Sequence, residues 1–236
     1  MHLYLIRHAD PDYERDTLTR QGFREARALA GRMKRVGLTH VYSSPLSRAL
    51  LTARPLARRV RLPIAQENWL VEPELSIVQN GDRYMLWDAF GEDVRSRDPL
   101  PTQESWDQVP PFDTLEVSEM WRVFRRNADD LLSRHGFVRE SGRYRIRQAN
   151  GDRVAIVCHN GTILLFLAHL LELPLSLVYC GFYAWPASVT VFLMEQHSAT
   201  WAVPRALHVA DVSHHFAARL EPQPRAFGRG RYQPFL

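Results

Sequence analysis

The sequence predicts an α/β protein of three layers, in which a mainly parallel sheet lies between two layers of helices. Residues 2–6 and 153–158 are short, almost wholly apolar runs of the kind that form strands buried on both faces, and residues 40–44 form a further strand. Segments with helical periodicity follow these strands, and such alternation is typical of parallel sheets covered by helices. Ligands of these sheets bind beyond the carboxyl ends of the strands.

The N-terminal part contains two strand–helix units. After the first strand, Thr19 is the expected N-cap of a helix, because apolar residues recur behind it at spacings of three and four. Gly37 ends this helix. After the second strand, Ser44 caps another helix, with Pro45 at its first helical position.

The C-terminal part continues the alternation. Residues 161–173 are typical of a largely buried helix that ends before Pro174. Residues 188–195 and 200–209 are typical of two strands, which would pair antiparallel across the turn between them.

Residues 67–150 interrupt this rhythm, and we interpret them as an insertion over the carboxyl edge of the sheet, within a single domain that spans residues 1–236. One clear helix is expected around residues 116–134. Turn signals at Ser141 and Gly142 then predict a projecting hairpin. The alternating arginines of this hairpin favour a solvated face, and they are Arg139, Arg143, Arg145 and Arg147.

The composition excludes several classes of protein. The net charge is +4, but 26 acidic residues are interspersed with 30 basic ones, which does not fit a polybasic nucleic-acid binder and suits a small anionic ligand equally well. The two cysteines, Cys158 and Cys180, form no disulfide framework. No apolar run approaches the roughly 18 residues that span a bilayer. We therefore expect a cytoplasmic protein that binds neither nucleic acid nor membrane.

Three polar features fall on the carboxyl edge of the predicted sheet. Arg7 and His8 follow the first strand, Arg48 lies at the start of a helix, and His159 follows a later strand. The forked donors of arginine suit phosphate oxygens, and helix N-termini add backbone N–H groups. A histidine among these positive charges stays neutral and is suited to act as a nucleophile. The sequence therefore predicts a phosphate pocket.

Phosphoryl transfer also needs an acid for the leaving oxygen, and Glu72 and Glu74 lie where the insertion leaves the sheet. A bound phosphate would raise the pKa of such a carboxyl. We expect no metal and no cofactor, because His214 and His215 would point to opposite sides of a strand and no carboxylate-rich ligand set accompanies them. Cys158 has no arginine six positions later, so we expect a small buried residue there instead of a cysteine nucleophile.

Five blocks of the sequence resemble, in order and spacing, those of the histidine phosphatase superfamily, branch 1, also called phosphoglycerate mutase-like. They are LIRHADPD, TLTRQGFREARALAGRM, VYSSPLSRALLTARPLA, WLVEPE and VAIVCHNGTILLFLAHLLELP. The tail that begins ADVSHHF is similar to that of an uncharacterised bacterial branch of these phosphatases. The resemblance implies a phosphoglycerate mutase-like fold, in which His8 becomes phosphorylated and the phosphoryl group is bound by Arg7, Arg48 and His159.

The same resemblance implies a glutamate as proton donor, and its Leu-x-Glu pattern favours Glu72, with Glu74 as the alternative. Two positions depart from the family pattern. Ala9 replaces the signature glycine, which requires a negative φ at this position. Asn160 replaces the first glycine of the usual His-Gly-Gly, and would add a side chain to the phosphate site.

These patterns predict a metal-independent phosphomonoester hydrolase that acts through a phosphohistidine on a small phosphorylated metabolite. Two alternatives remain at this point. The same phosphoenzyme would serve a phosphoglycerate mutase-type phosphotransferase, and a non-catalytic phosphate-binding or interaction module would keep the fold without turnover. The oligomeric state has no signature in the sequence.

Overall fold

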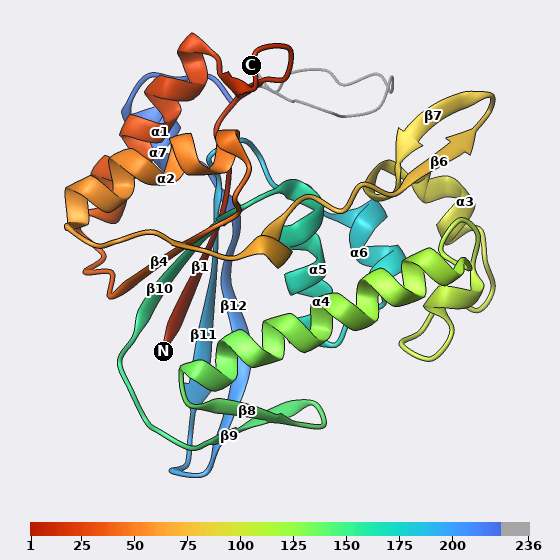
Figure 1. Ribbon diagram of the computed structural model, residues 1–236. Helices are drawn as coiled ribbons and strands as arrows, with labels where there is room; N and C mark the ends of the chain where they lie inside the picture. The colour runs from red at the N-terminus through yellow and green to blue at the C-terminus, as the bar shows by residue number, and fades with distance from the viewer. Residues whose placement is uncertain (223–236) are drawn as a thin grey trace.

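The computed structural model of the 236-residue chain describes residues 1–222, and it contains an eight-stranded sheet with helices on both faces (Figure 1). The tail resemblance noted above falls partly on residues 223–236, outside the described residues. Along the sheet the strands are Ala65–Gln66 (β5), His40–Ser43 (β4), Arg153–Cys158 (β10), His2–Arg7 (β1), Val189–Gln196 (β11), Trp201–Asp211 (β12), Arg143–Ile146 (β9) and Phe137–Glu140 (β8).

The remaining elements are two small hairpins, seven α-helices and three 3₁₀ turns among the described residues. The hairpin strands are Pro11–Asp12 (β2) with Thr17–Leu18 (β3), and Ser76–Gln79 (β6) with Asp82–Met85 (β7). The α-helices are Arg20–Met33 (α1), Ser47–Val60 (α2), Gly91–Arg95 (α3), Leu115–Arg134 (α4), Asn160–Leu171 (α5), Leu175–Gly181 (α6) and Ser213–Ala217 (α7). The 3₁₀ turns are Asn68–Leu70 (η1), Leu86–Asp88 (η2) and Trp106–Gln108 (η3).

The α/β class is confirmed, but the sheet is mixed and not mainly parallel. Strands β5, β4, β10 and β1 pair in parallel, whereas β11, β12, β9 and β8 add four antiparallel pairings. The β8–β9 and β11–β12 hairpins account for two of these four antiparallel pairings, because a chain that returns through a short turn can pair only in the antiparallel sense. The parallel half is the part that positions the polar residues at strand ends.

The three layers are visible in Figure 1, where α1, α2 and α7 lie on one side of the sheet and α4, α5 and α6 on the other. Strand β1 supplies both cores, because successive side chains point to opposite faces. Leu3 and Leu5 pack in one apolar cluster with residues of α4 and α5, and Ile6 packs in the other with residues of α1 and α2. No helix within residues 1–222 is long and apolar enough to cross a membrane.

The starts of the first two helices differ from each other. The predicted N-cap of α1 is confirmed, since Thr19 Oγ1 accepts a hydrogen bond from Gly22 N at 3.0 Å. The predicted capping of α2 by Ser44 is wrong, because α2 begins at Ser47 after Leu46. Ser44 instead lies directly after β4, in the loop that leads to α2, where its hydroxyl faces the polar site described below.

The predicted helix around residues 116–134 is confirmed as α4, but the hairpin after it does not project. Strand β9 pairs with β12, so that Arg145 lies opposite Trp201 and the hairpin extends the main sheet. Edge pairing to a neighbouring strand satisfies backbone groups that a free hairpin would leave to water. Apolar residues of the presumed insertion, including Trp106 and Phe112, belong to the same cluster as Leu3.

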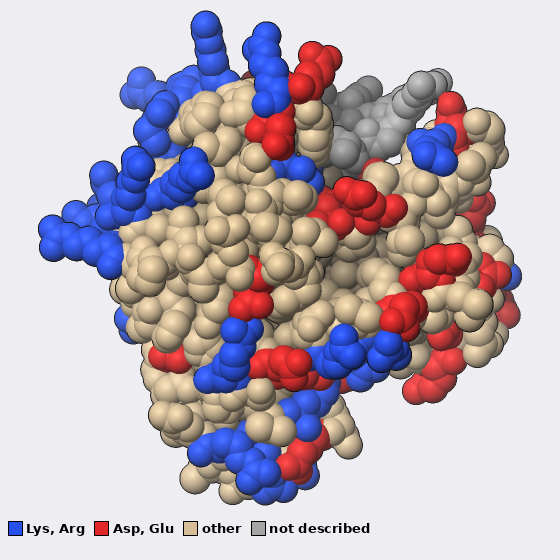
Figure 2. Space-filling model, viewed as in Figure 1, with Lys and Arg blue, Asp and Glu red and all other residues tan. Residues whose placement is uncertain are grey.

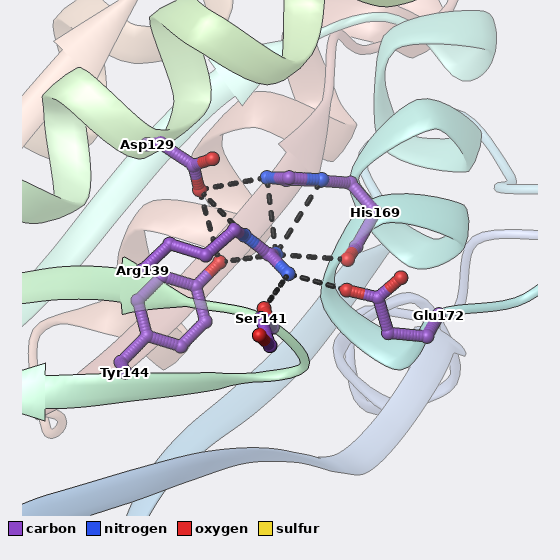
Figure 3. Close-up of polar contacts among 6 residues, drawn as sticks. All are labelled: Asp129, Arg139, Ser141, Tyr144, His169 and Glu172. Atoms are coloured by element: carbon purple, nitrogen blue, oxygen red, sulfur yellow. Dashed lines mark hydrogen bonds and ion pairs between the residues drawn. The ribbon is translucent and has the colours of Figure 1, made fainter.

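The expected solvated face of arginines is wrong for Arg139. The hairpin pairs Glu140 with Arg143, which places Arg139 opposite Tyr144 and on the other face from Arg143. The Arg139 side chain is only 11% exposed. Figure 3 shows it surrounded by polar partners from α4, the hairpin and α5, which are Asp129, Ser141, Tyr144, His169 and Glu172.

The paired histidines His214 and His215 lie on helix α7 and not on a strand, so the argument from opposite strand faces does not apply to them.

Charge is distributed unevenly over the surface. In Figure 2 lysine and arginine side chains gather over α1 and α2, whereas acidic side chains predominate on the side of α3. The positive net charge therefore does not extend over the segment between η1 and α4.

Candidate active site

The polar site lies at the carboxyl ends of two adjacent parallel strands. Strand β1 ends at Arg7 and is followed by His8, while β10 ends at Cys158, directly opposite Arg7, and is followed by His159. The imidazole centroids of His8 and His159 are 5.1 Å apart. The predicted meeting of residues far apart in sequence at this edge is therefore found.

The ring of His8 is held in one tautomer by its own neighbour. His8 is fully buried, and its Nδ1 lies 2.8 Å from the carbonyl oxygen of Ala9. A carbonyl can only accept, so Nδ1 carries the proton and Nε2 carries a free lone pair. Nε2 has no hydrogen-bond partner within residues 1–222. Burial, followed by the charges of His159, Arg7 and Arg48, holds the pKa of His8 well below its ordinary value of 6.5.

His159 is oriented by Ser44, which follows the neighbouring strand β4. Its Nε2 lies 2.8 Å from Ser44 Oγ, and its Nδ1 has no hydrogen-bond partner in the described part of the chain. Burial and the nearby guanidinium groups of Arg48 and Arg7 hold the pKa of His159 well below 6.5 as well. Two neutral imidazoles thus face each other in a pocket whose fixed charges are positive.

The two predicted arginines supply those charges from different elements. Arg7 Nη1 donates to the carbonyl oxygen of Ala184 at 2.6 Å, and its guanidinium lies 5.1 Å from the centre of the Tyr183 ring. Arg48 is the second residue of α2, with its guanidinium 5.5 Å from the Tyr13 ring. The Nε atoms of both arginines are buried, and no residue of 1–222 accepts a hydrogen bond from them. These donors remain available to an anion.

Glu72 enters the site from the segment after η1. Its Oε1 accepts from the Gly161 N–H at 2.7 Å, and its Oε2 lies 3.9 Å from His159 Nδ1. Burial raises the pKa of Glu72 to about 7, against the opposing effects of Arg7 and of the Gly161 N–H. The cause differs from the one expected, because the shift arises without a bound phosphate. Glu74 is exposed, and it has no hydrogen bond or ion pair among residues 1–222.

The two departures from the family pattern have different consequences. Ala9 does not have a positive φ, so the small replacement is accommodated as expected. The side-chain oxygen of Asn160 accepts from the Ala184 N–H at 3.0 Å. Asn160 and Arg7 therefore both bind Ala184, in the loop after α6: Asn160 accepts from its N–H, and Arg7 donates to its carbonyl oxygen.

The sequence analysis missed three residues that support the site. Ser44 contacts His159, the N–H of Ala9 donates to Thr52 Oγ1 at 2.9 Å, and the N–H of Asp10 donates to Glu25 Oε2 at 2.8 Å. Thr52 and Glu25 lie on the buried faces of α2 and α1. A polar residue on an otherwise apolar helix face was the signal, since buried polar groups require partners.

Three side chains of the candidate active site are also of the types that bind metal ions. His8, Glu72 and His159 each offer one ligand atom, and these atoms lie within 4.8 Å of one another. An ion held there would occupy nitrogen lone pairs that a phosphoryl acceptor needs. The same three groups thus suit either a metal or nucleophilic chemistry, and the two uses exclude each other.

Residues 3–205 match the model of a known family, the histidine phosphatase superfamily (branch 1). The chain belongs to this superfamily. One curated relative, a probable phosphoglycerate mutase GpmB of Proteus mirabilis (strain HI4320), is 30% identical over 88 residues, which cover 34% of this chain and 41% of that protein. The chain thus matches less than half the length of this relative.

Two solved structures show the same fold at low identity. Phosphoserine phosphatase from Entamoeba histolytica, in complex with 3-phosphoglyceric acid, is 18% identical with a TM-score of 0.59, covering 90% of this chain and 98% of that chain. A mycobacterial glucosyl-3-phosphoglycerate phosphatase is 21% identical with a TM-score of 0.59, covering 89% and 98%. The phosphoglycerate mutase-like fold expected from the sequence is confirmed.

Proposed function

We propose that this protein is a metal-independent phosphomonoesterase that acts through a phosphohistidine on a small phosphorylated metabolite. The state of His8 supports this most directly. Its Nδ1 proton is engaged by the Ala9 carbonyl, and its Nε2 lone pair has no partner within residues 1–222, although two guanidinium groups lie near enough to act on its charge. A neutral nitrogen facing cationic donors suits attack on a dianionic phosphoryl group.

In the first half-reaction, His8 Nε2 attacks phosphorus and the bond from phosphorus to the ester oxygen breaks. Glu72 donates its proton to the leaving oxygen, and a pKa of about 7 keeps about half of this carboxyl protonated at neutral pH. Charge on the transferred group is stabilised by the guanidinium groups and by the N-terminal end of α5, through donors on Arg7, Arg48 and His159.

In the second half-reaction, water attacks the phosphohistidine. Glu72, now a carboxylate, accepts the proton that the water loses, and the bond from nitrogen to phosphorus breaks. Inorganic phosphate leaves, His8 returns to its neutral form and Glu72 returns to its acid form. Asn160 acts in this scheme through Arg7, because both hold Ala184.

A mutase is the second candidate, and the match to a probable phosphoglycerate mutase favours it. The two reactions share the phosphohistidine and differ in its fate, which is transfer to water in a phosphatase and to a substrate hydroxyl in a mutase. The structural neighbours named above are phosphatases, which supports hydrolysis as the first choice. Release of inorganic phosphate in proportion to ester consumed distinguishes the two.

The first experiment is hydrolysis of p-nitrophenyl phosphate in excess chelator by the wild type, His8→Ala and a control, His197→Ala, whose side chain is 83% exposed. We expect the wild type and the control to turn over alike, and His8→Ala to lose more than about 10⁴-fold in kcat. A radiolabelled phosphoryl group should be trapped on the wild type as an acid-labile adduct. Undiminished activity in His8→Ala would refute the proposal.

A further inference from the structure

Asp88 lies beside the candidate active site on the η2 turn, in a segment that is otherwise buried. Leu86, Trp87 and Ala89 are each at most 8% exposed. The Trp87 ring packs against Gly161, at the start of α5, so closely that an added Cβ at Gly161 would lie 2.6 Å from Trp87 Cε3 and 2.9 Å from Glu72 Oε1. Trp87 and Glu72 therefore contact the same helix terminus, and the η2 backbone is fixed next to the proton donor.

The carboxyl group of Asp88 is half-buried and lacks a partner. Within residues 1–222 it makes no hydrogen bond and no ion pair. Arg7 is near enough to act on its charge, but burial has the larger effect and raises the pKa of Asp88 to about 6. Asp88 is thus mostly ionised at neutral pH. A carboxylate in this position can accept a hydrogen bond from a ligand that carries a donor.

The position of Asp88 relative to the reaction follows from Arg7, whose charge acts on Asp88, and from Trp87, which packs against the start of α5 that Glu72 also contacts. Arg7 is the residue proposed to hold the phosphoryl group, and Glu72 is the residue proposed to protonate the leaving oxygen. Because Trp87 adjoins Glu72, a group on Asp88 would meet the alcohol part of the ester. A carboxylate there accepts hydrogen bonds from hydroxyl or ammonium groups and repels a second anion.

We propose that Asp88 accepts a hydrogen bond from the alcohol part of the substrate, and thereby selects small phosphomonoesters that carry a hydroxyl or ammonium group over those that carry a carboxylate there. This specificity rests on the proposed phosphatase function. This chain would then differ in substrate preference from proteins that bind phosphoglycerates, because the carboxylate of a bound phosphoglycerate would face Asp88.

The test compares kcat/KM for four esters of similar size at one pH above the pKa of Asp88. Glycerol 3-phosphate and 3-phosphoglycerate differ at one terminal group, a hydroxymethyl against a carboxylate. O-Phosphoethanolamine offers an ammonium, and n-propyl phosphate offers no donor. We expect the wild type to prefer glycerol 3-phosphate by at least about tenfold over both 3-phosphoglycerate and n-propyl phosphate. The ammonium ester then shows which kind of donor is favoured.

Two variants separate the charge of Asp88 from its acceptor oxygens. Asp88→Asn removes the charge, and should raise the relative efficiency with 3-phosphoglycerate by about tenfold. Asp88→Ala removes the acceptor, and should bring glycerol 3-phosphate and n-propyl phosphate within about threefold of each other. Asp107→Asn, an exposed position on the neighbouring turn η3, makes the same charge change away from the site and should leave every ratio unchanged.

The outcomes separate this inference from the proposed function. Equal efficiency with the four esters, or ratios that stay the same in both Asp88 variants, overturns the role of Asp88 while the phosphohistidine reaction stands. A wild type that releases phosphate from none of the esters, nor from p-nitrophenyl phosphate, refutes the hydrolase itself. Ratios are the readout because a general loss of activity, from any disturbance of Glu72 or of folding, cancels in them.

Discussion

Two buried polar clusters of this protein are each built around an arginine, and they differ in how completely their groups are bonded. At the strand ends, four buried nitrogens have no partner among residues 1–222: Nε of Arg7, Nε2 of His8, Nε of Arg48 and Nδ1 of His159. Around Arg139, every guanidinium nitrogen donates a hydrogen bond to a neighbouring residue. These neighbours are Asp129, Ser141, Tyr144, His169 and Glu172 (Figure 3).

The difference teaches which of the two clusters is built for a ligand. Each buried polar group left unsatisfied costs about 1–3 kcal/mol, so several unsatisfied donors and acceptors together favour a site whose ligand supplies the partners. Within residues 1–222 the Arg139 guanidinium has all its nitrogens bonded, and its partners join α4, the β8–β9 hairpin and the end of α5. The groups at the strand ends are therefore the better candidates to bind a ligand, and the contacts of Arg139 hold three elements together.

The largest expected effect is the loss of kcat when the proposed proton donor at the strand ends is replaced. Glu72→Gln keeps the shape of the side chain but cannot donate an acidic proton, so kcat for an alkyl phosphate should fall by about 10²–10⁴-fold. Glu74→Gln is the matched control, because Glu74 is exposed and makes no hydrogen bond or ion pair within residues 1–222. Steady-state kinetics on both variants measures this. Equal losses in the two, or a loss only in Glu74→Gln, would remove Glu72 from the proposed role.

The next effect concerns the bonded cluster. Arg139→Met leaves Asp129 and Glu172 without their cation, and breaking a buried pair in this way should lower the free energy of unfolding by about 3 kcal/mol. Urea denaturation measures it, with Arg147→Met as the exposed control on the same hairpin. The kcat of the folded variant should stay within about twofold of the wild type. A stable variant with a large loss of kcat would show that this cluster takes part in catalysis.

The smallest effect is the pH dependence of kcat/KM. With a pKa of about 7, Glu72 loses its proton as pH rises, so kcat/KM for an alkyl phosphate should fall towards tenfold per pH unit above about 7. His8 does not oppose this on the acid side, because its pKa is held well below 6.5 and it stays neutral. p-Nitrophenyl phosphate needs less protonation of its leaving group and should show a weaker decline. A flat profile for the alkyl ester would contradict the assignment of Glu72.

Several site features could be predicted from sequence because they depend on where strands end. Arg7, His8 and His159 follow apolar runs, and parallel strands bring such positions to one edge of a sheet. The antiparallel pairing of residues 188–195 with residues 200–209 was predicted and is confirmed as β11 with β12. The pairings of β11 with β1 and of β9 with β12 were missed, because strand order depends on pairing between distant segments. The burial of Arg139 was also missed, because it depends on which residues the hairpin register places opposite each other.

The sequence by itself determined the strands and helices, the motif blocks of the superfamily and the residue types that meet at the sheet edge. These are local properties, encoded in the periodicity and order of residues along the chain. Only the tertiary structure decided the tautomer of His8, the contact of Glu72 with the start of α5 and the position of the Asp88 carboxylate near Arg7. Those depend on desolvation and on hydrogen-bond partners contributed by segments far apart in the chain, which no local pattern records.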